Sequence, residues 1–391
     1  MKIGIDARLY GTKHSGIGRY TAEIIKNLEK LDQKNDYYVF LSHDGMTDYQ
    51  PQNPKFKKIS ADFKVYGWQE QLLFPFMLAD YQLDLMYFTH FNVPIFYPKK
   101  FIVTIHDLII SHYPQSRATT LNPFLYRVKL FFYRWVVQSA AKRAKKIIAV
   151  SNYTKNDIVR LLGVKPEKIS VIYEGVDLPG RVAPLGAPLC GISQGEPSTG
   201  APDCQKVLQD LGIGGNFIIY AGSAYPHKNL ERLISAFEKI NQALPDLLLV
   251  LVGKNNYFYE RLKSYADNSV SAATRKKIIF TDYLTDDRLV CLYQSARAYV
   301  FPSLIEGFGL PPLEAQNYGA SVISSNKTCL PEILGDSAVY FDPENIQDMA
   351  DKIISTLNDE NLKQRLINQG RENLKKYSWS KAAQEILELF Q

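Results

Sequence analysis

Cysteine is scarce in this chain of 391 residues, which contains Cys190, Cys204, Cys291 and Cys329 and no other. No two of them stand in the C-x-x-C spacing that is typical of zinc and dithiol redox sites, so the sequence indicates neither kind of site. A chain with so few cysteines suits a reducing compartment, and we therefore expect a cytoplasmic protein.

A long apolar run free of charge is also missing. The most apolar long stretch, residues 121–141, contains Arg127, Lys129 and Arg134, which argues against a membrane span. The first residues are typical of a strand rather than a signal peptide. The 46 basic and 40 acidic residues leave a net charge of +6. This charge is far below that of a nucleic-acid-binding protein, so we expect no nucleic-acid partner, but it favours an anionic ligand or a membrane surface.

The chain alternates short β-branched or aromatic runs with longer helical patterns. Several of the short runs are apolar on both faces, which is typical of parallel strands that helices cover on both sides. In the first half we expect helices at residues 20–31 and 124–142 and strands at 2–6, 37–41, 85–88, 101–105, 147–150 and 169–173.

The alternation stops at residues 178–215, which are rich in Gly, Pro and Ser, and we interpret this segment as a mobile linker or insertion. It restarts with strands expected at 217–221, 247–252, 277–281, 298–301, 321–324 and 338–341. Helices are expected at 230–242, 286–295, 311–318, 346–357, 361–377 and 380–390. The fold class is α/β, with two doubly wound, Rossmann-like parallel-sheet domains, 1–177 and 216–377, whose carboxyl strand ends face a central cleft.

The strongest motif is EGFGLPPLE, which runs from Glu306 to Glu314 directly after a buried strand. Its glycines allow a ligand to approach the backbone, and its prolines suit the first turn of a helix. The helix end and its N–H groups then suit an anion such as a diphosphate, at Gly307, Phe308, Gly309 and Leu310. The carboxylates fit such a site if they accept hydrogen bonds from hydroxyl groups, Glu306 from a sugar and Glu314 from a ribose. The alternative is a capped helix with solvated carboxylates.

This pattern closely resembles the E-x7-E motif of glycosyltransferase family 4, a large family of retaining enzymes with the GT-B fold. The resemblance extends over nearly the whole chain outside residues 178–215, through the segments IDAR, GIGRY, TIHDL, VSNYT and PHKNL. The opening and the PHKN segment look most like the bacterial mannosyltransferase-like branch used in polysaccharide assembly. The resemblance implies a hexosyltransferase with an N-terminal acceptor-binding domain, onto which the helix at 378–391 packs back, and a C-terminal nucleotide-sugar-binding domain.

Several single residues take candidate roles from the resemblance. Lys228 precedes a helix and can place its charge on the diphosphate leaving group, where a surface lysine is the ordinary alternative. Many family members carry an arginine a few residues earlier as a second phosphate clamp. Here the matching residue is Ser223, which can donate one hydrogen bond. His106 ends a buried strand and matches the family histidine that contacts the donor, although a core histidine is the usual alternative.

Two further regions complete the expected donor site. Gly16, placed in the first strand-to-helix loop, matches the family loop that covers the donor phosphates and the acceptor, with a plain turn as the alternative. Tyr283 and Leu284 follow a strand of the second domain, where the family frames the nucleotide base largely with backbone groups.

The resemblance implies substitution at the anomeric carbon with retention, in which the leaving phosphate takes the proton of the acceptor. Lys228 and the amides of residues 307–310 stabilise that phosphate, so neither a metal nor another cofactor is expected, and the chain has no D-x-D motif. GDP-mannose is the favoured donor, and a saccharide or lipid-linked sugar is the expected acceptor.

Three other classes of protein are alternatives to this interpretation. An NAD-dependent oxidoreductase needs G-x-G-x-x-G in a tight turn, and the segment from Gly16 to Thr21 lacks the third glycine. A non-catalytic sugar-nucleotide-binding regulatory protein and a GT-B-fold sugar-nucleotide epimerase stay open, and donor turnover with and without acceptor separates them.

The helical stretch 124–146 combines aromatic and basic residues in a way that suits an anionic membrane surface. The aromatic residues are Phe124, Tyr126, Phe131, Phe132, Tyr133 and Trp135, and the basic cluster at its end is Lys142, Arg143, Lys145 and Lys146. The alternative is that the aromatic side chains pack into the first domain. We expect a protein that associates peripherally with the inner membrane face and uses a lipid-linked acceptor.

Overall fold

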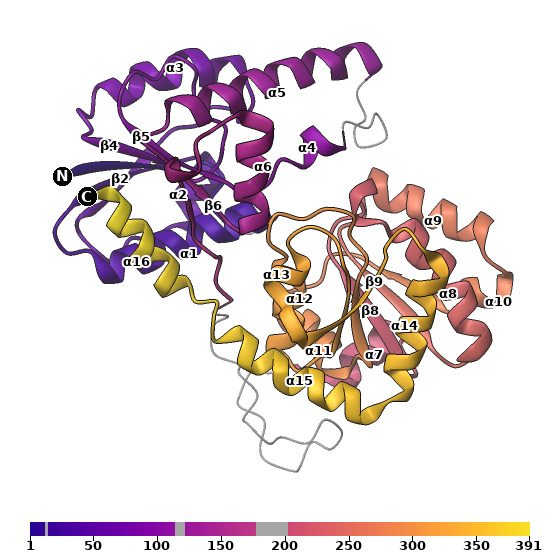
Figure 1. The fold of residues 1–391 in the computed structure, drawn as a ribbon. Helices are drawn as coiled ribbons and strands as arrows, with labels where there is room; N and C mark the ends of the chain where they lie inside the picture. The colour runs from indigo at the N-terminus through magenta and orange to yellow at the C-terminus, as the bar shows by residue number, and fades with distance from the viewer. Residues whose placement is uncertain (12–14, 114–121, 177–201) are drawn as a thin grey trace. The chain divides into compact units, whose positions relative to one another are not determined.

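The computed structural model describes residues 1–11, 15–113, 122–176 and 202–391, and it divides the chain into two compact units (Figure 1). Unit 1 consists of Met1–Asp177 together with Tyr377–Gln391, and unit 2 consists of Leu178–Lys376. The C-terminal helix therefore belongs to the first unit, as we expected from the resemblance.

The described residues of unit 1 form a seven-stranded sheet with the order β3-β2-β1-β4-β5-β6-β7, and every neighbouring pair is parallel. The strands are β1 (Lys2–Asp6), β2 (Asp36–Leu41), β3 (Phe56–Ser60), β4 (Leu85–Phe88), β5 (Phe101–Ile105), β6 (Lys146–Ala149) and β7 (Ile169–Val171). The strand order reverses between β1 and β4, and this is the point where doubly wound sheets place their ligands.

Helices cover both faces of this sheet. On one face, α3 (Trp68–Ala79) and α5 (Pro123–Arg143) share a core with the strands through Phe74, Leu78 and Val137. On the other, α1 (Ser15–Leu31) lies beside α16 (Trp379–Phe390), whose Phe390 packs on Tyr37 and Tyr87 (Figure 1). The remaining described helices of unit 1 are α2 (His43–Asp48), α4 (Ile109–His112) and α6 (Asn152–Leu162).

The described residues of unit 2 form a second parallel sheet, with the order β10-β9-β8-β11-β12-β13. Its strands are β8 (Phe217–Ala221), β9 (Leu248–Val252), β10 (Ile278–Thr281), β11 (Ala298–Phe301), β12 (Val322–Ser325) and β13 (Ala338–Phe341). Its helices are α7 (Cys204–Asp210), α8 (Leu230–Ala243), α9 (Tyr257–Ser269), α10 (Ala272–Arg275), α11 (Asp286–Ser295), α12 (Leu310–Asn317), α13 (Leu330–Leu334), α14 (Ile346–Asn358) and α15 (Glu360–Leu374). Its strand order reverses between β8 and β11.

The expected linker is too long at its C-terminal end. Residues 204–210 form α7, which packs on α11 and is joined to it by a disulfide between Cys204 and Cys291. The second domain therefore begins before residue 216, because the covalent bond and the packing fix α7 to it. The rest of the expected linker, residues 178–201, lies outside the described residues, as does Cys190. A disulfide is unusual in a reducing compartment, so cysteine usage no longer supports a cytoplasmic location.

Candidate active site

The candidate site of unit 2 lies at the carboxyl ends of the adjacent strands β8 and β11. The chain leaves β8 into a 3₁₀ turn at Pro226–Lys228, and it leaves β11 into the loop that contains Glu306. Asn229 adopts a left-handed conformation, and its side-chain amide donates hydrogen bonds to the carbonyls of Pro302 (3.0 Å) and Pro343 (2.7 Å). The bond to Pro302 fastens the loop after β8 to the loop after β11, and the bond to Pro343 fastens it to the segment that follows β13.

Lys228 and Glu306 meet between these loops. The Lys228 Nζ lies 2.6 Å from the Glu306 Oε1, and the two side chains are 16% and 10% exposed. The Lys228 ammonium also lies 5.7 Å from the centre of the Phe301 ring. The structure thus brings together the two unit 2 residues that the sequence singled out for catalysis, within hydrogen-bond reach of each other.

The loop between them and α12 has the backbone that the motif predicts. Gly309 has a φ of +104°, which L side chains rarely adopt, and a Cβ there would meet Leu330 at 3.0 Å. The thiol of Cys329 donates to the carbonyls of Glu306 (3.3 Å) and Phe308 (3.2 Å), and these contacts hold the backbone of the loop in place. Because α12 begins at Leu310, the positive end of its helix dipole lies at this loop.

The side chains of the other motif residues differ in how far they are buried. Phe308 and Leu310 are buried, so a ligand at this loop meets their backbone rather than their side chains. Glu314 lies half-buried in the first turns of α12. This arrangement suits a phosphate bound by main-chain N–H groups and a helix N-terminus.

Ser223 lies half-buried in the loop that follows β8. Its carbonyl accepts a hydrogen bond from the Tyr220 hydroxyl at 2.8 Å, and the Tyr259 hydroxyl donates to the carbonyl of Gly222 at 2.9 Å. These tyrosines fix the loop conformation. Ser223 therefore stands on a fixed backbone in the same loop as Lys228.

Tyr283 and Leu284 follow the edge strand β10, two strands away from β8 at the same edge of the sheet. Tyr283 is 66% exposed, whereas Leu284 is buried. The Asp282 carboxylate accepts hydrogen bonds from the backbone N–H groups of Asn255 (2.8 Å) and Tyr283 (2.7 Å), which ties the two neighbouring loops together.

His227 is a site residue that we did not single out, although it stands within the PHKN segment. It is half-buried beside Lys228 and stacks on Tyr225 at 5.8 Å between ring centres. Burial and the positive charge of Lys228 lower the pKa of His227 to about 4, so the imidazole is neutral near pH 7.

In unit 1, His106 stands at the carboxyl end of β5 with both ring nitrogens engaged. Its Nδ1 lies 3.0 Å from the Glu174 Oε1, and its Nε2 lies 3.0 Å from the carbonyl of Thr89. Burial by itself would lower the pKa of His106, but the hydrogen bond and charge of Glu174 outweigh it and raise that pKa. A direct hydrogen bond from His106 to a donor would require one of these contacts to break.

His90 is a second histidine at this edge, and it is not among the site residues predicted from the sequence. It follows β4 and is buried, with its ring 6.4 Å from that of His106. Burial and the positive charges of His106 and Arg8 hold its pKa well below the usual range. Within the described part of the chain, its Nδ1 finds no hydrogen-bond partner.

The end of β1 carries a buried ion-pair group at the same edge. Arg8 bonds Asp6 at 2.6 Å and Glu70 at 2.6 Å, and Glu70 comes from α3. The polar groups at the carboxyl edge of the unit 1 sheet thus include Asp6, Arg8, Glu70, His90, His106 and Glu174.

Gly16 lies in the first turn of α1 and not in a loop, so its predicted location is wrong. The helix α1 begins at Ser15, whereas the apolar pattern predicted a start at residue 20. The pattern missed the first turn because that turn contains Ser15, Gly16 and Gly18. Among the described residues, a Cβ at the exposed Gly16 would meet nothing within 4 Å, so its described neighbours do not require a glycine there.

The aromatic stretch of unit 1 forms α5, which ends at Arg143. Phe124, Phe131, Phe132 and Trp135 are 74%, 67%, 51% and 47% exposed. The alternative that these four side chains pack into the domain is therefore wrong. Tyr133 does pack inward, against Phe91.

The basic cluster is divided between elements, because Lys145 lies past the end of the helix and Lys146 begins β6. Arg143 donates hydrogen bonds to the carbonyls of Ile95, Tyr97 and Pro94, so its guanidinium is committed to the fold.

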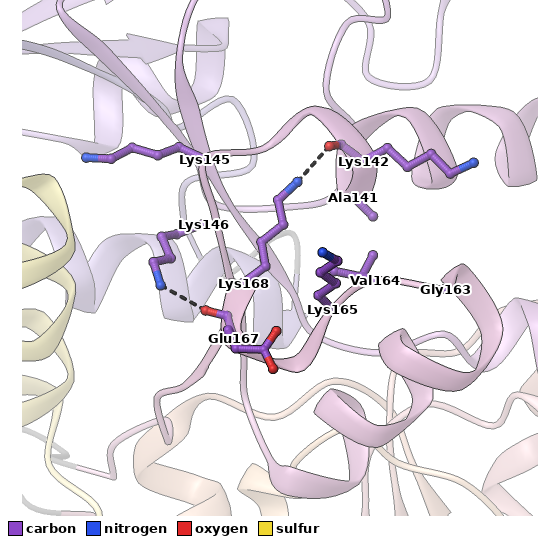
Figure 2. A pocket seen from close by; sticks show the side chains of 9 residues that line it. All are labelled: Ala141, Lys142, Lys145, Lys146, Gly163, Val164, Lys165, Glu167 and Lys168. Carbon is purple, nitrogen blue, oxygen red and sulfur yellow. Dashed lines mark hydrogen bonds between the residues drawn. The ribbon is translucent and has the colours of Figure 1, made fainter.

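A lysine-lined hollow of about 460 Å³ lies beside the amino end of β6 (Figure 2). The Lys168 ammonium donates to the carbonyl of Lys142 at 2.6 Å, and that of Lys146 donates to the carbonyl of Glu167 at 2.9 Å. Figure 2 shows the side chains of Lys142 and Lys145 pointing away in opposite directions. The ammonium groups do not converge on one point, so the hollow lacks the geometry of a phosphate site.

The chain has two doubly wound parallel-sheet domains. In the second, a Lys–Glu pair lies beside the start of a helix at the point where the strand order reverses. Together these features define a glycosyltransferase of the GT-B class. Among solved structures, HepE of Anabaena in complex with UDP and glucose has a TM-score of 0.72 at 17% identity, covering 100% of this chain and 99% of that one. WaaG, a glycosyltransferase involved in lipopolysaccharide biosynthesis, has a TM-score of 0.71 at 14% identity, covering 100% and 99%. At these identities the likeness is one of fold.

The family follows from the sequence models that the chain matches. Residues 14–179 match the model described as Glycosyltransferase Family 4, and residues 207–373 match Glycosyl transferases group 1. The chain belongs to glycosyltransferase family 4, which confirms the resemblance drawn from its motifs.

The relatives indicate the branch. The O-antigen chain mannosyltransferase B of Escherichia coli is 25% identical, with 96% of each chain covered. The serotype-specific mannosyltransferase WbdA of Escherichia coli is 29% identical over 75% of this chain, which spans 33% of the length of WbdA.

Proposed function

We propose that this glycosyltransferase transfers mannose from GDP-mannose to a saccharide or lipid-linked acceptor during polysaccharide assembly, with retention at the anomeric carbon. The relatives named mannosyltransferases support the sugar, and the neighbour in complex with UDP and glucose supports a nucleotide-sugar donor. In this proposal unit 2 binds the donor and unit 1 binds the acceptor.

The observation that carries the proposal is the Lys228–Glu306 pair beside the start of α12. A diphosphate at this point meets the Lys228 ammonium, the positive helix end and the loop amides, which together offset its charge without a metal ion. Glu306 then accepts a hydrogen bond from a hydroxyl of the transferred sugar, and Glu314 accepts from the ribose.

The reaction that fits this site breaks the bond from the anomeric carbon to the phosphate oxygen and forms a bond to the acceptor oxygen on the same face. The leaving phosphate takes the acceptor's proton, and Lys228 stabilises its growing negative charge. Double displacement with Glu306 as nucleophile is less suited, because its carboxylate is engaged by Lys228 at 2.6 Å.

Peripheral membrane association forms part of the proposal. The exposed aromatic side chains of α5 support it, since an apolar face with basic neighbours suits the interface of an anionic bilayer. Among the helices of the described ranges, none is both long and apolar enough to cross a bilayer. We place the protein at the inner, cytoplasmic face.

The test is an NMR-monitored reaction of GDP-mannose with oligomannose and with lipid-linked acceptors. We expect an α-mannosyl product, which retains the donor configuration, and GDP release that depends on acceptor. A β-linked product overturns retention. Donor binding without any turnover supports the non-catalytic regulator instead, and turnover without an acceptor supports the epimerase.

A further inference from the structure

Unit 1 contains an apolar pocket of about 400 Å³ between α3 and the loop that connects β4 to β5. Its walls include Leu72, Pro75, Phe76 and Ala79 from the helix and Phe96 and Tyr97 from the loop. This volume lies within the range of ligand-binding pockets, which are mostly apolar with a few polar groups. None of the roles proposed for donor or acceptor chemistry uses it.

The pocket is a built feature, because its loop wall is held from two helices. The Gln71 side chain of α3 accepts a hydrogen bond from the backbone N–H of Ile95 at 2.9 Å. The Arg143 guanidinium of α5 donates to the carbonyls of Tyr97 and Pro94, at 2.9 Å each, and to that of Ile95. The separation of loop and helix is therefore set by the fold.

The mouth of the pocket is flanked by large exposed apolar side chains. Phe76 is 75% exposed, Phe96 is 64% exposed, and Trp68 at the start of α3 is 68% exposed. Helices α3 and α5 cover the same face of the sheet, so the exposed aromatic residues of α5 belong to the same layer (Figure 1). Large apolar side chains exposed on one layer are a feature of interaction sites.

Charge and polarity indicate what this layer contacts. Lys99 lies on the pocket wall and is exposed, with the exposed Lys100 next to it, and α5 adds Arg127, Lys129 and Arg134. Exposed basic side chains together with exposed apolar ones, Trp68 and Trp135 among them, match the interface of an anionic bilayer. A peptide partner would need several polar groups for its backbone, whereas the side chains of the pocket wall are apolar apart from Lys99 and Tyr97, whose hydroxyl is buried.

We propose that this pocket receives a hydrocarbon chain of an anionic membrane phospholipid while α3 and α5 rest on the bilayer surface. The inference rests on the membrane association proposed above and adds a second helix and a chain-binding site to it. The head group lies near Lys99 and Lys100, and the chain lies between Leu72, Phe76 and Phe96.

The test uses vesicles of phosphatidylcholine and phosphatidylglycerol in which the phosphatidylglycerol carries a photoactivatable diazirine near the end of one chain. After irradiation, mass spectrometry should map lipid adducts to residues 72–79 and 96–99. Ala79→Phe fills the pocket from an exposed position at the end of α3. We expect it to reduce these adducts at least fivefold while co-sedimentation with the vesicles changes less than twofold.

The matched control is Ala243→Phe, which places the same side chain at the exposed last residue of α8 in unit 2 and should leave the adducts unchanged. Leu73→Gln removes an exposed apolar residue of α3 that does not line the pocket, whereas Leu72→Gln removes one that does. We expect Leu72→Gln alone to weaken the labelling.

Four results would overturn the inference. Co-sedimentation without pocket adducts, or adducts that persist in Ala79→Phe, leaves membrane association standing and removes the pocket. A protein that stays in the supernatant at low salt contradicts both the membrane association and the chain-binding pocket. Adducts from a diazirine-labelled polyprenyl phosphate but not from the phospholipid assign the pocket to a lipid-linked acceptor instead. Transfer from GDP-mannose, measured in the same samples, reports separately on the proposed function.

Discussion

Lys228 and Glu306 are 78 positions apart in the chain, and their side chains form an ion pair of 2.6 Å at the carboxyl edge of unit 2. The pair exists because β8 and β11 are neighbours in the sheet, so the loops that leave them face each other. A lysine for the leaving phosphate and a carboxylate for the sugar thereby stand at one point of the site.

The first prediction separates the two motif carboxylates. We expect Glu306→Ala to lower kcat by roughly 10²–10³-fold, since it removes a group that acts at the reacting sugar. Glu314→Ala should mainly raise the KM for the donor, because a ribose contact contributes equally to ground and transition states. Steady-state kinetics with varied donor concentration measure both effects.

Controls for this prediction come from the same unit. Glu360→Ala breaks a 2.6 Å pair with Arg297, which precedes β11 at the opposite edge of the sheet, and it should leave kinetics unchanged. Glu306→Ala leaves the Lys228 charge without its partner, which costs up to about 3–5 kcal/mol of stability. The double variant Lys228→Met/Glu306→Gln should recover stability but not activity. Normal turnover in Glu306→Ala would remove it from the site.

The second prediction concerns metal ions. We expect transfer to persist in EDTA, since the Lys228 ammonium and the α12 N-terminus offset the charge of the diphosphate. The measurement compares initial rates after extensive chelation with and without added Mg²⁺ or Mn²⁺. An activity that disappears with EDTA and returns with either ion contradicts the prediction.

Much of the fold could be predicted because its strands are buried on both faces. Residues 217–221 and 298–301 coincide with β8 and β11, since parallel strands covered by helices read as continuous apolar runs. The strand β3 was missed because it is an edge strand whose sequence, FKKIS, contains Lys57 and Lys58. Lysines are common on edge strands, where they discourage pairing with other chains.

The sequence predicts individual residues of the site but not which of them contact each other. The motif identified Glu306 and the PHKN segment identified Lys228, yet their contact depends on the strand order. Glu174, which holds His106, had no local signal, because it follows β7 two strands away from β5. A lone glutamate in a loop acquires its role through tertiary neighbours alone.

The third prediction concerns pH. Glu174 raises the pKa of His106 above its ordinary value of about 6.5, so the charged pair stabilises unit 1 fully below that value. This contribution is lost as the pH rises through the higher pKa of the folded state. Glu174→Gln should lower the titration midpoint of the His106 ring, followed by NMR. An unchanged midpoint would show that Glu174 does not hold the proton on His106.

The fourth prediction concerns Gly16. A methyl group at this position meets no atom of the described part of the chain within 4 Å, and helix propensity favours alanine by up to about 1 kcal/mol. Gly16→Ala should therefore fold with unchanged or higher thermal stability, yet it should raise the KM for the donor about tenfold if the ligand approaches this backbone. Wild-type kinetics in a fully stable variant would show that no ligand comes close to Gly16.

The central claim, that Lys228 binds the donor diphosphate, is tested most directly by calorimetric titration of GDP and guanosine into wild type and Lys228→Met. Lys228→Met/Glu306→Gln serves as the stability-matched control. We predict that the wild type binds GDP at least tenfold more tightly than guanosine, and that both variants lose most of this preference while their guanosine affinity stays the same. Equal preference for GDP in the wild type and in Lys228→Met would contradict the account.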